Sequence, residues 1–533
     1  MNSFKRIPSN VYKVVVWLTI VIVLIMLNVN YFFKEFVWST KCIEPYAFVN
    51  KAEYIVNATE EGLSIEQKVS DFLYMTEILK ESYPLNDIDE EIFGFQIEEK
   101  NEEFLNLIKE SKNDMEFYCI LWKYFSTVNS AHSGLPFPSL ERYEHNRAKA
   151  SEGYEGIEVG EYATYWKNVF KTYATKYSEE DKVSFRYAEG EYYLNGSEND
   201  YIVEMNGMVV EQYLTEFPMA NRRYYDFIQD KFYYDHLVFH AKAGVPVQIK
   251  MASGKSLSVY YDEIYECYCH NVLRLAEKED VPKREIYSYL SDNGEIAYLH
   301  LGSFEWDYYL DIKEQLENIT REQGGVDFLL IDLRNNSGGI RRPMAELIIS
   351  YLVEERIKAK SIYYIPYTEQ NAKWEGYSGA LTKKVPKVLE NGKWFFVGEE
   401  TFKVNGDSDF SGEIFVLIDS YTCSAADYIA AVLKDNDLGV LVGENTSGEG
   451  LGSTAYSFVL PNSGLMIEYM AGHGVNSDGT LNSRYGTSPD YYVERTISDI
   501  NCRENESVFE TWDVLLENDS QIQYIYENFI LKD

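Results

Sequence analysis

A serine late in the chain stands between a strand-like apolar run and a helix-like pattern. Residues 414–418 predict a buried strand, a polar turn follows, and Ser424 comes directly before the helical pattern. The first amides of a helix lack acceptors and favour negative charge, so a serine placed there could attack a carbonyl group. The competing interpretation is a helix cap, because Ser424 and Asp427 have nearly the spacing of a capping box.

A second strand-to-helix turn contains two adjacent glycines. Residues 328–333 predict a strand, residues 335–339 a turn, and the residues that follow a helix. Glycines such as Gly338 and Gly339 let the backbone come close to a ligand and present bare N–H groups. Such amides can stabilise an oxyanion, and one good donor lowers an acyl-transfer barrier by about 3 kcal/mol. The alternative is a tight turn without chemistry.

Together these two stretches resemble the C-terminal-processing, or tail-specific, serine peptidase family, which includes the tricorn core domain. The family's Asp-Leu-Arg-x-Asn-x-Gly-Gly pattern is matched by Asp332, Leu333, Arg334, Asn336, Gly338 and Gly339. Its nucleophile segment is matched loosely by residues 424–427. The resemblance covers about residues 286–493 and implies an α/β core of the ClpP/crotonase type. It also implies that Ser424 is the nucleophile and that Gly338, Gly339 and Ala425 supply oxyanion amides.

The lysine that many members of this family use as general base is absent. The position 25 residues after Ser424 holds Glu449, inside Gly448-Glu449-Gly450. A carboxyl group, whose reference pKa is about 4.3, is a weak base unless burial raises that pKa. The sequence therefore lacks the Ser-Lys dyad and is similar to the tricorn-like branch, which uses a histidine from far upstream.

The histidine that this resemblance selects is His132. The stretch from 126 to 134 resembles the Asp-x-His-Thr-Gly turn of tricorn-like members, whose histidine is the general base. An imidazole suits that role because its reference pKa of about 6.5 lies near working pH. The group that would orient His132 stays open: the candidates are Ser130, Glu449 and Ser483, the last occupying the place of a tricorn glutamate.

The N-terminus predicts a membrane anchor. Residues 14–33 carry no charged side chain, and about twenty helical residues span the roughly 30 Å of a bilayer core. Lys5, Arg6 and Lys13 precede this span, which favours a cytoplasmic N-terminus and an extracellular main body. No small-residue cleavage site follows, so we expect an uncleaved, single-pass signal anchor. A cleaved signal peptide or a buried core helix is the alternative.

The composition limits the partners of the chain. Its 533 residues carry 49 Lys+Arg against 86 Asp+Glu, a formal net charge of −37 that argues against nucleic-acid binding. Six scattered cysteines do not form a dense disulfide framework. The Cys267-Tyr-Cys269-His270 stretch lacks the second ligand pair of a zinc site, and a half-buried strand explains it at least as well, so we expect no metal. Acyl transfer at a serine needs no cofactor, and we expect none.

The patterns along the chain divide it into six parts. Residues 65–129 have apolar side chains at helical spacing, and residues 200–210, 244–251 and 256–261 resemble strands of a PDZ domain without its usual carboxylate loop. The expected parts are a tail and signal anchor (1–33), a linker (34–64), a helical domain (65–180), a divergent PDZ-like β module (183–275), a tail-specific-protease-like core (285–496) and an acidic helical tail (497–533).

These features lead to one expected function and one alternative. The first is a membrane-anchored, extracytoplasmic serine endopeptidase that cleaves peptides or unfolded and C-terminal protein segments by acyl transfer. In this reading Ser424 attacks the scissile carbonyl and His132 transfers the proton. The alternative is a catalytically inactive homologue that binds peptides or other ligands at the cell surface.

Overall fold

The structure is a computed structural model. It describes residues 62–85, 97–128, 130–140, 142–144, 159–173, 179–219, 223–226, 228–268, 285–322, 326–354, 356–368, 370–371, 387–390, 393–406, 408, 410–452, 455–504 and 511–532. The expected anchor, nearly all of the expected linker, and Cys269 and His270 lie outside the described residues. No helix in the described part of the chain has the length and apolarity needed to cross a bilayer.

A six-stranded sheet forms the centre of the core. Its strand order is β10-β11-β12-β16-β17-β21, and all neighbours are parallel except the β10–β11 pair. The central strands are apolar on both faces, as expected for a sheet covered on both sides. The strands are β10 (Ile286–Leu290), β11 (Ile296–Leu301), β12 (Phe328–Asp332), β16 (Glu413–Ile418), β17 (Val440–Gly443) and β21 (Tyr491–Tyr492).

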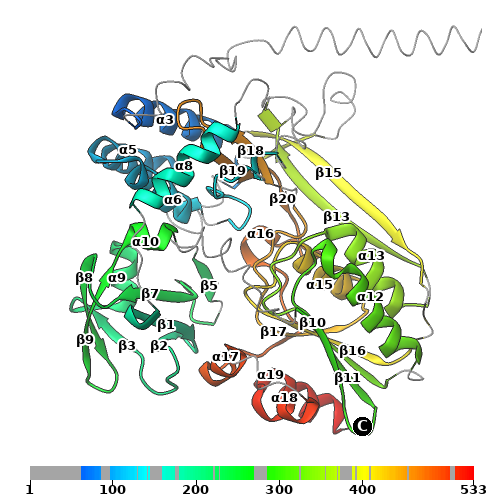
Figure 1. The fold of residues 1–533 in the computed structure, drawn as a ribbon. Coiled ribbons are helices and arrows are strands. Elements are labelled where there is room, and N and C mark those ends of the chain that lie inside the picture. The colour runs from blue at the N-terminus through cyan, green and yellow to red at the C-terminus, as the bar shows by residue number, and fades with distance from the viewer. Residues whose placement is uncertain are drawn as a thin grey trace, which may run out of the picture.

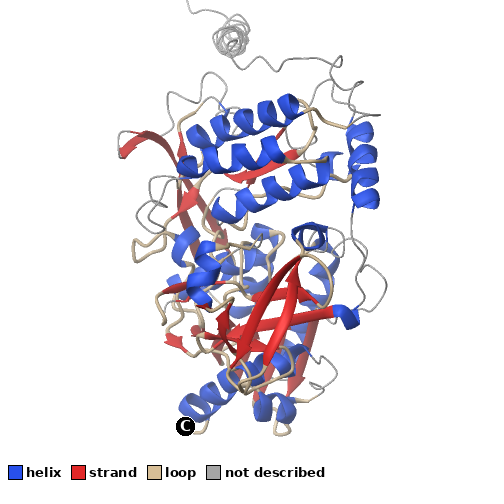
Figure 2. Ribbon diagram, turned by 90° about the vertical axis from the view of Figure 1, so that its left-hand side faces the viewer, coloured by secondary structure: helices blue, strands red, loops and turns tan. Residues whose placement is uncertain are grey.

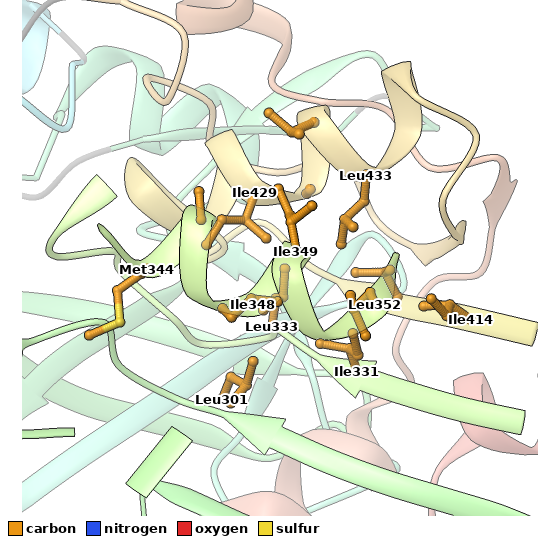
Figure 3. Packing of buried hydrophobic residues seen from close by; sticks show 14 of the residues in the cluster. Leu301, Ile331, Leu333, Met344, Ile348, Ile349, Leu352, Ile414, Ile429 and Leu433 are labelled. Carbon is orange, nitrogen blue, oxygen red and sulfur yellow. The ribbon is translucent and has the colours of Figure 1, made fainter. Parts of the chain in front are cut away.

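Helices cover both faces of this sheet. On one face, α13 and α15 pack through side chains such as Ile348 and Ile429 against Ile331 of β12 (Figure 3). On the opposite face, the C-terminal helices pack Leu515 and Ile522 against the sheet (Figure 1). The helices of the first face are η4 (Trp306–Tyr308), α12 (Tyr309–Glu317), the π-helix η5 (Asn318–Glu322), α13 (Arg341–Leu352) and α15 (Ala425–Asp435). The C-terminal helices are α17 (Ile497–Glu504), α18 (Trp512–Asn518), α19 (Ser520–Ile525) and the π-helix η6 (Tyr526–Ile530).

Two smaller sheets extend the core toward the N-terminal helices. One has the order β14-β15-β13-β20, and the other is the hairpin β18–β19. The strands are β13 (Ile357–Pro366), β14 (Lys387–Glu390), β15 (Lys393–Val404), β18 (Ala455–Val459), β19 (Met466–Met470) and β20 (His473–Gly474), and α16 (Asn482–Tyr485) follows them.

The N-terminal helices pack onto the β18–β19 hairpin. Phe72 of α3 and Leu121 of α6 share one apolar cluster with Phe458 of β18 and Tyr469 of β19. Residues from opposite ends of the chain thus form a single core, and Figure 2 shows these helices grouped at one end of the molecule. The helices are α3 (Ile65–Ser82), η1 (Ile97–Lys100), α5 (Asn101–Glu110), α6 (Asp114–Val128) and α8 (Val159–Tyr173).

A separate β module follows the helices. Its seven-stranded sheet has the order β2-β1-β7-β9-β8-β3-β4 and its own apolar cluster, and β5 and β6 form a two-stranded sheet beside it. The strands are β1 (Lys182–Ala188), β2 (Glu191–Leu194), β3 (Ile202–Met205), β4 (Met208–Val209), β5 (Tyr224–Asp226), β6 (Lys231–Tyr233), β7 (His236–His240), β8 (Val245–Met251) and β9 (Ser256–Tyr261). The helices of this part are η2 (Glu179–Asp181), α9 (Val210–Glu216) and α10 (Glu263–Tyr268).

The β module meets the core at a small cavity of about 40 Å³. Carboxyl groups of both parts face it, among them Asp226 of the module and Glu444 and Glu494 of the core. Burial, reinforced by these acidic neighbours and Glu189, raises the pKa of Glu494 to about 7. This raised pKa means that the folded state favours the protonated carboxyl group.

Replacing Glu494 by glutamine is expected to stabilise the protein increasingly as the pH rises from the usual carboxyl pKa to about 7, and by a constant amount above that. Below the usual carboxyl pKa both folded and unfolded states hold the proton, whereas above about pH 7 the folded state carries an unfavourable charge. Because Glu494 is half exposed, solvent screening keeps the effect small, about 1–3 °C in thermal midpoint at pH 8 and none at pH 4. Thermal melts of both proteins from pH 4 to pH 8 measure this. An equal difference at every pH would contradict it.

Candidate active site

Ser424 occupies the N-cap position of α15 in a rarely populated backbone conformation. Its φ of 53° and ψ of −117° lie outside the regions that non-glycine residues ordinarily adopt. Two backbone hydrogen bonds hold the turn: Ser424 N donates to Gly448 O at 3.0 Å, and Cys423 N donates to Asn336 O at 3.0 Å. The Ser424 side chain makes no capping hydrogen bond to α15, so the capping-box interpretation is wrong.

Asp427, the other half of the expected capping box, instead connects α15 to two loops and to α16. Its fully buried carboxylate accepts hydrogen bonds from the Thr446 and Thr487 hydroxyls at 2.5 and 2.7 Å. It also accepts bonds from Gly450 N and Asn482 Nδ2, both at 2.9 Å. Burial raises the pKa of Asp427, and these hydrogen bonds oppose that rise. Asp427 therefore fixes the loop around Glu449 against the helix that begins after Ser424.

Glu449 lies in that loop with its side chain fully buried. Its backbone has a φ of 65°, a left-handed conformation flanked by two glycines. One carboxylate oxygen accepts the Ala131 N–H at 2.8 Å, and the other accepts the His132 N–H at 2.7 Å. Glu449 thus binds the backbone of a segment that lies more than 300 residues earlier in the chain.

His132 is carried by the turn that follows α6, and this turn is anchored to the β18–β19 hairpin. Gly134 and Glu468 of β19 exchange both backbone hydrogen bonds, at 2.8 and 3.0 Å. The Ser133 hydroxyl accepts the Met470 N–H at 2.9 Å. The hairpin that belongs to the core therefore brings the N-terminal turn to the site.

The imidazole of His132 lies between Ser424 and Glu449. His132 Nε2 is 3.1 Å from Ser424 Oγ, which is hydrogen-bonding distance. His132 Nδ1 is 3.1 Å from Glu449 Oε2, although its N–H direction is not aligned for a hydrogen bond. A hydroxyl, an imidazole and a carboxylate thus lie next to one another in that order, which is the order of groups that activates a serine nucleophile.

The other two candidate orienting groups do not reach the imidazole. Ser130 Oγ lies 3.2 Å from His132 N and accepts that backbone N–H instead. Ser483 is buried on α16, and its hydroxyl has no hydrogen-bond partner among the described residues. Of the three candidates, the structure brings only Glu449 against the ring of His132.

The glycine turn lies directly against Ser424. A Cβ added to Gly338, whose φ is 103°, would stand 2.8 Å from Ser424 Cβ and 2.9 Å from Ala425 N. Within the turn, Gly338 N donates to Asn336 Oδ1 at 2.8 Å. The described residues offer no acceptor to the amides of Gly339 and Ala425. Of the three expected oxyanion donors, these two are the ones without a hydrogen-bond partner in the described part of the chain.

A protein-family model matches part of the chain. Residues 295–493 match the model described as "Peptidase family S41". This match includes Ser424, Glu449 and the glycine turn, whereas His132 lies outside it.

Curated relatives are matched over part of the chain. A carboxyl-terminal-processing protease of Synechocystis sp. is 27% identical over 156 residues, which are 29% of this chain and 29% of that protein. The carboxy-terminal processing protease CtpA of Bacillus subtilis is 23% identical over 221 residues, which are 41% of this chain and 39% of that protein. The alignments span less than half the length of these relatives.

Among solved structures, mature CPAF has a similar fold. Its crystal structure covers 86% of this chain and 99% of its own, with a TM-score of 0.51 and 14% sequence identity. At this identity the likeness shows the fold, and it extends beyond the part matched by the family model. The expected mixed α/β fold is confirmed, and the region from residue 295 to residue 493 is similar to peptidase family S41 and to carboxyl-terminal-processing proteases.

Proposed function

We propose that this chain is a serine endopeptidase of the tricorn-like branch, with Ser424 as nucleophile, His132 as general base and Glu449 as the group that orients the histidine. The observation that carries the proposal is the 3.1 Å approach of His132 Nε2 to Ser424 Oγ, with the Glu449 carboxylate 3.1 Å from the other ring nitrogen. The strained backbone of Ser424 supports it, because such strain is typical of functional positions.

The reaction proceeds by acyl transfer. Ser424 Oγ attacks the carbonyl carbon of the scissile peptide bond while His132 Nε2 takes the hydroxyl proton. The amides of Gly339 and Ala425 donate to the oxyanion, and buried Glu449 stabilises the imidazolium. The imidazolium then protonates the departing amine, an acyl-enzyme remains on Ser424, and water activated by His132 releases the new carboxyl terminus.

The loss of the family lysine fits this mechanism. A carboxylate at position 449 accepts the two N–H groups of Ala131 and His132, whereas a lysine ammonium would face those donors unfavourably. Glu449 therefore replaces a general base with an orienting group, and the base comes from the turn after α6. This is the role that the sequence left open.

The substrate class follows from the chemistry and from the β module. A peptide is the simplest acyl donor for this site, and unfolded or C-terminal segments can enter it as extended chains. The β module, which resembles a divergent PDZ domain in its strand sequences, would bind such a segment by adding it to a sheet edge.

The site of action is also part of the proposal. The uncharged stretch 14–33 with its preceding basic residues supports a signal anchor and an extracellular body. Exposing intact cells to an added protease tests this, because an external body should be degraded. If the body is degraded only after lysis, the proposed location is wrong.

A fluorophosphonate probe tests the catalytic proposal. The reagent phosphonylates an activated serine, so peptide mapping should find the label on Ser424 and not on the neighbouring Ser420 or Ser447. The Ser424→Ala variant should take up no label. Absence of labelling in the wild-type protein would instead favour the inactive homologue that binds peptides.

Replacing Gly338 by alanine is expected to lower kcat about tenfold to a hundredfold while leaving the fold intact. The added Cβ would overlap Ser424 Cβ and Ala425 N, and the φ of 103° strains any side chain. A displacement of about 1 Å at the nucleophile is enough for such a loss. Gly254→Ala is the matched control, since that glycine also has positive φ but its Cβ would meet nothing. Equal kcat values for the two variants would contradict the expectation.

A further inference from the structure

The C-terminal tail contributes polar side chains to the interior of the core, beyond the residues matched by the family model. Asp519 and Gln521, at the start of α19, are buried and point at Arg334. Arg334 itself is fully buried and belongs to the turn that carries Gly338 and Gly339. Hydrogen bonds to Arg334 therefore link the C-terminal tail to the glycine turn.

The side-chain N–H groups of Arg334 find acceptors in β12 and in the C-terminal tail. Asp332 accepts its Nε at 2.8 Å and its Nη2 at 2.6 Å. From the tail, Asp519 lies 2.9 Å from Nη2 and 3.1 Å from Nη1, and Gln521 accepts Nη1 at 2.7 Å. Because the N–H donors of the guanidinium lie in one rigid plane, these acceptors fix both its position and its orientation.

Arg334 directly precedes the glycine turn in the sequence. Two residues after Arg334, Asn336 bonds Cys423 N through its carbonyl oxygen and Gly338 N through its side chain. Those bonds place the glycine turn against the residue before Ser424 and against Ser424 itself. The position of the Gly339 amide therefore depends on where Arg334 is fixed.

We propose that Asp519 and Gln521 are positioning residues that act through Arg334 on the glycine turn. The C-terminal helical tail would then help to hold the oxyanion donors of the active site in place. The inference rests on the proposed peptidase function. It adds residues from outside the matched family region to the machinery of the site.

The neighbouring residue Asp499 supplies a matched control. Asp499 is likewise a buried carboxylate of the tail, and it caps α17 through Thr496 and binds Ser520, while Asp519 caps α19. Of these two carboxylates, Asp519 is the one that contacts Arg334. Asp519→Ala and Asp499→Ala therefore remove similar capping and burial, and they differ in their connection to the glycine turn.

The experiment compares kcat and KM of these variants per folded molecule, well below each melting temperature. We expect Asp519→Ala to lower kcat about tenfold or more with KM within twofold, because the lost interaction acts on the transition state. Asp499→Ala should lower the melting temperature but keep kcat within twofold. Asp519→Asn, which retains an acceptor for Arg334, should recover most of the lost kcat. Equal kcat losses in the two alanine variants would overturn the inference.

A second measurement does not depend on catalysis. Hydrogen exchange of the amides from 334 to 340 should accelerate in Asp519→Ala and stay at the wild-type rate in Asp499→Ala. If wild-type Ser424 takes up no fluorophosphonate, the proposed function fails and this exchange experiment alone decides on the tail. Unchanged exchange in Asp519→Ala would refute the positioning role.

Discussion

Alanine at Ser424 is expected to lower kcat for peptide cleavage by about 10⁶-fold, and alanine at His132 by a similar factor. The two atoms lie 3.1 Å apart and act in one step, since the hydroxyl attacks only as the imidazole removes its proton. The double variant should therefore be no slower than either single variant. Steady-state cleavage of an unstructured peptide, followed by mass spectrometry, measures all three.

Two variants close to these in chemistry serve as controls. Ser420→Ala removes a hydroxyl four residues before the nucleophile, and His236→Ala removes a partly exposed histidine of the β module that pairs with Asp235. Both should keep kcat within about twofold, as surface changes of this kind usually have small effects. A His132→Ala variant as fast as the wild type would mean that another group is the base.

The local elements of the core could be predicted from the sequence because their signals are short-range. The apolar runs before Ser424 and before the glycine turn form β16 and β12, and helices follow both as expected. The strands within 454–460 and 465–470 are the kind of hairpin that alternating apolar residues and a Pro-to-Gly turn indicate. Such patterns need no knowledge of distant contacts.

The residues around Ser424 in the sequence do not show whether it is a helix cap or a nucleophile. Ser-x-x-Asp is compatible with a capping box, and only the structure shows that Asp427 is bound by groups from two other loops and from α16. Those partners lie between 19 and 60 residues away in the sequence. The local pattern was therefore ambiguous between a cap and a nucleophile.

The assembly of the site depends on contacts across nearly 300 residues or more. His132 is brought to Ser424 by the pairing of Gly134 with Glu468, and no local pattern specifies that pairing. The tail residues Asp519 and Gln521 gave no signal either, because a polar pair in an acidic helical segment ordinarily faces solvent. The family resemblance pointed to His132, and the packing of the N-terminal helices on β18–β19 explains how its side chain comes to lie beside Ser424.

Glutamine at Glu449 is expected to lower kcat by about 10⁴-fold, a loss comparable to that seen when the carboxylate of such a triad is neutralised. A glutamine amide would keep the shape of the side chain but could not stabilise the imidazolium, and its NH2 end would face one of the two backbone N–H groups, of Ala131 or of His132, that the carboxylate now accepts. The melting temperature should fall as well, because those buried donors lose a charged acceptor. Kinetics per folded molecule separate the two effects.

Lysine at the same position is the sharper variant, because it restores the residue that many relatives use as a base. We expect Glu449→Lys to be inactive, since its ammonium would face the two backbone N–H groups that the carboxylate now accepts. Glu468→Gln is the control: that carboxylate lies on β19 beside the His132 turn but pairs with Arg142, so kcat should stay within a fewfold. Activity in Glu449→Lys would mean that the site can still work as a Ser-Lys dyad and that Glu449 does not act through His132. Its loss, together with an active Glu468→Gln, would support a carboxylate that orients the imidazole.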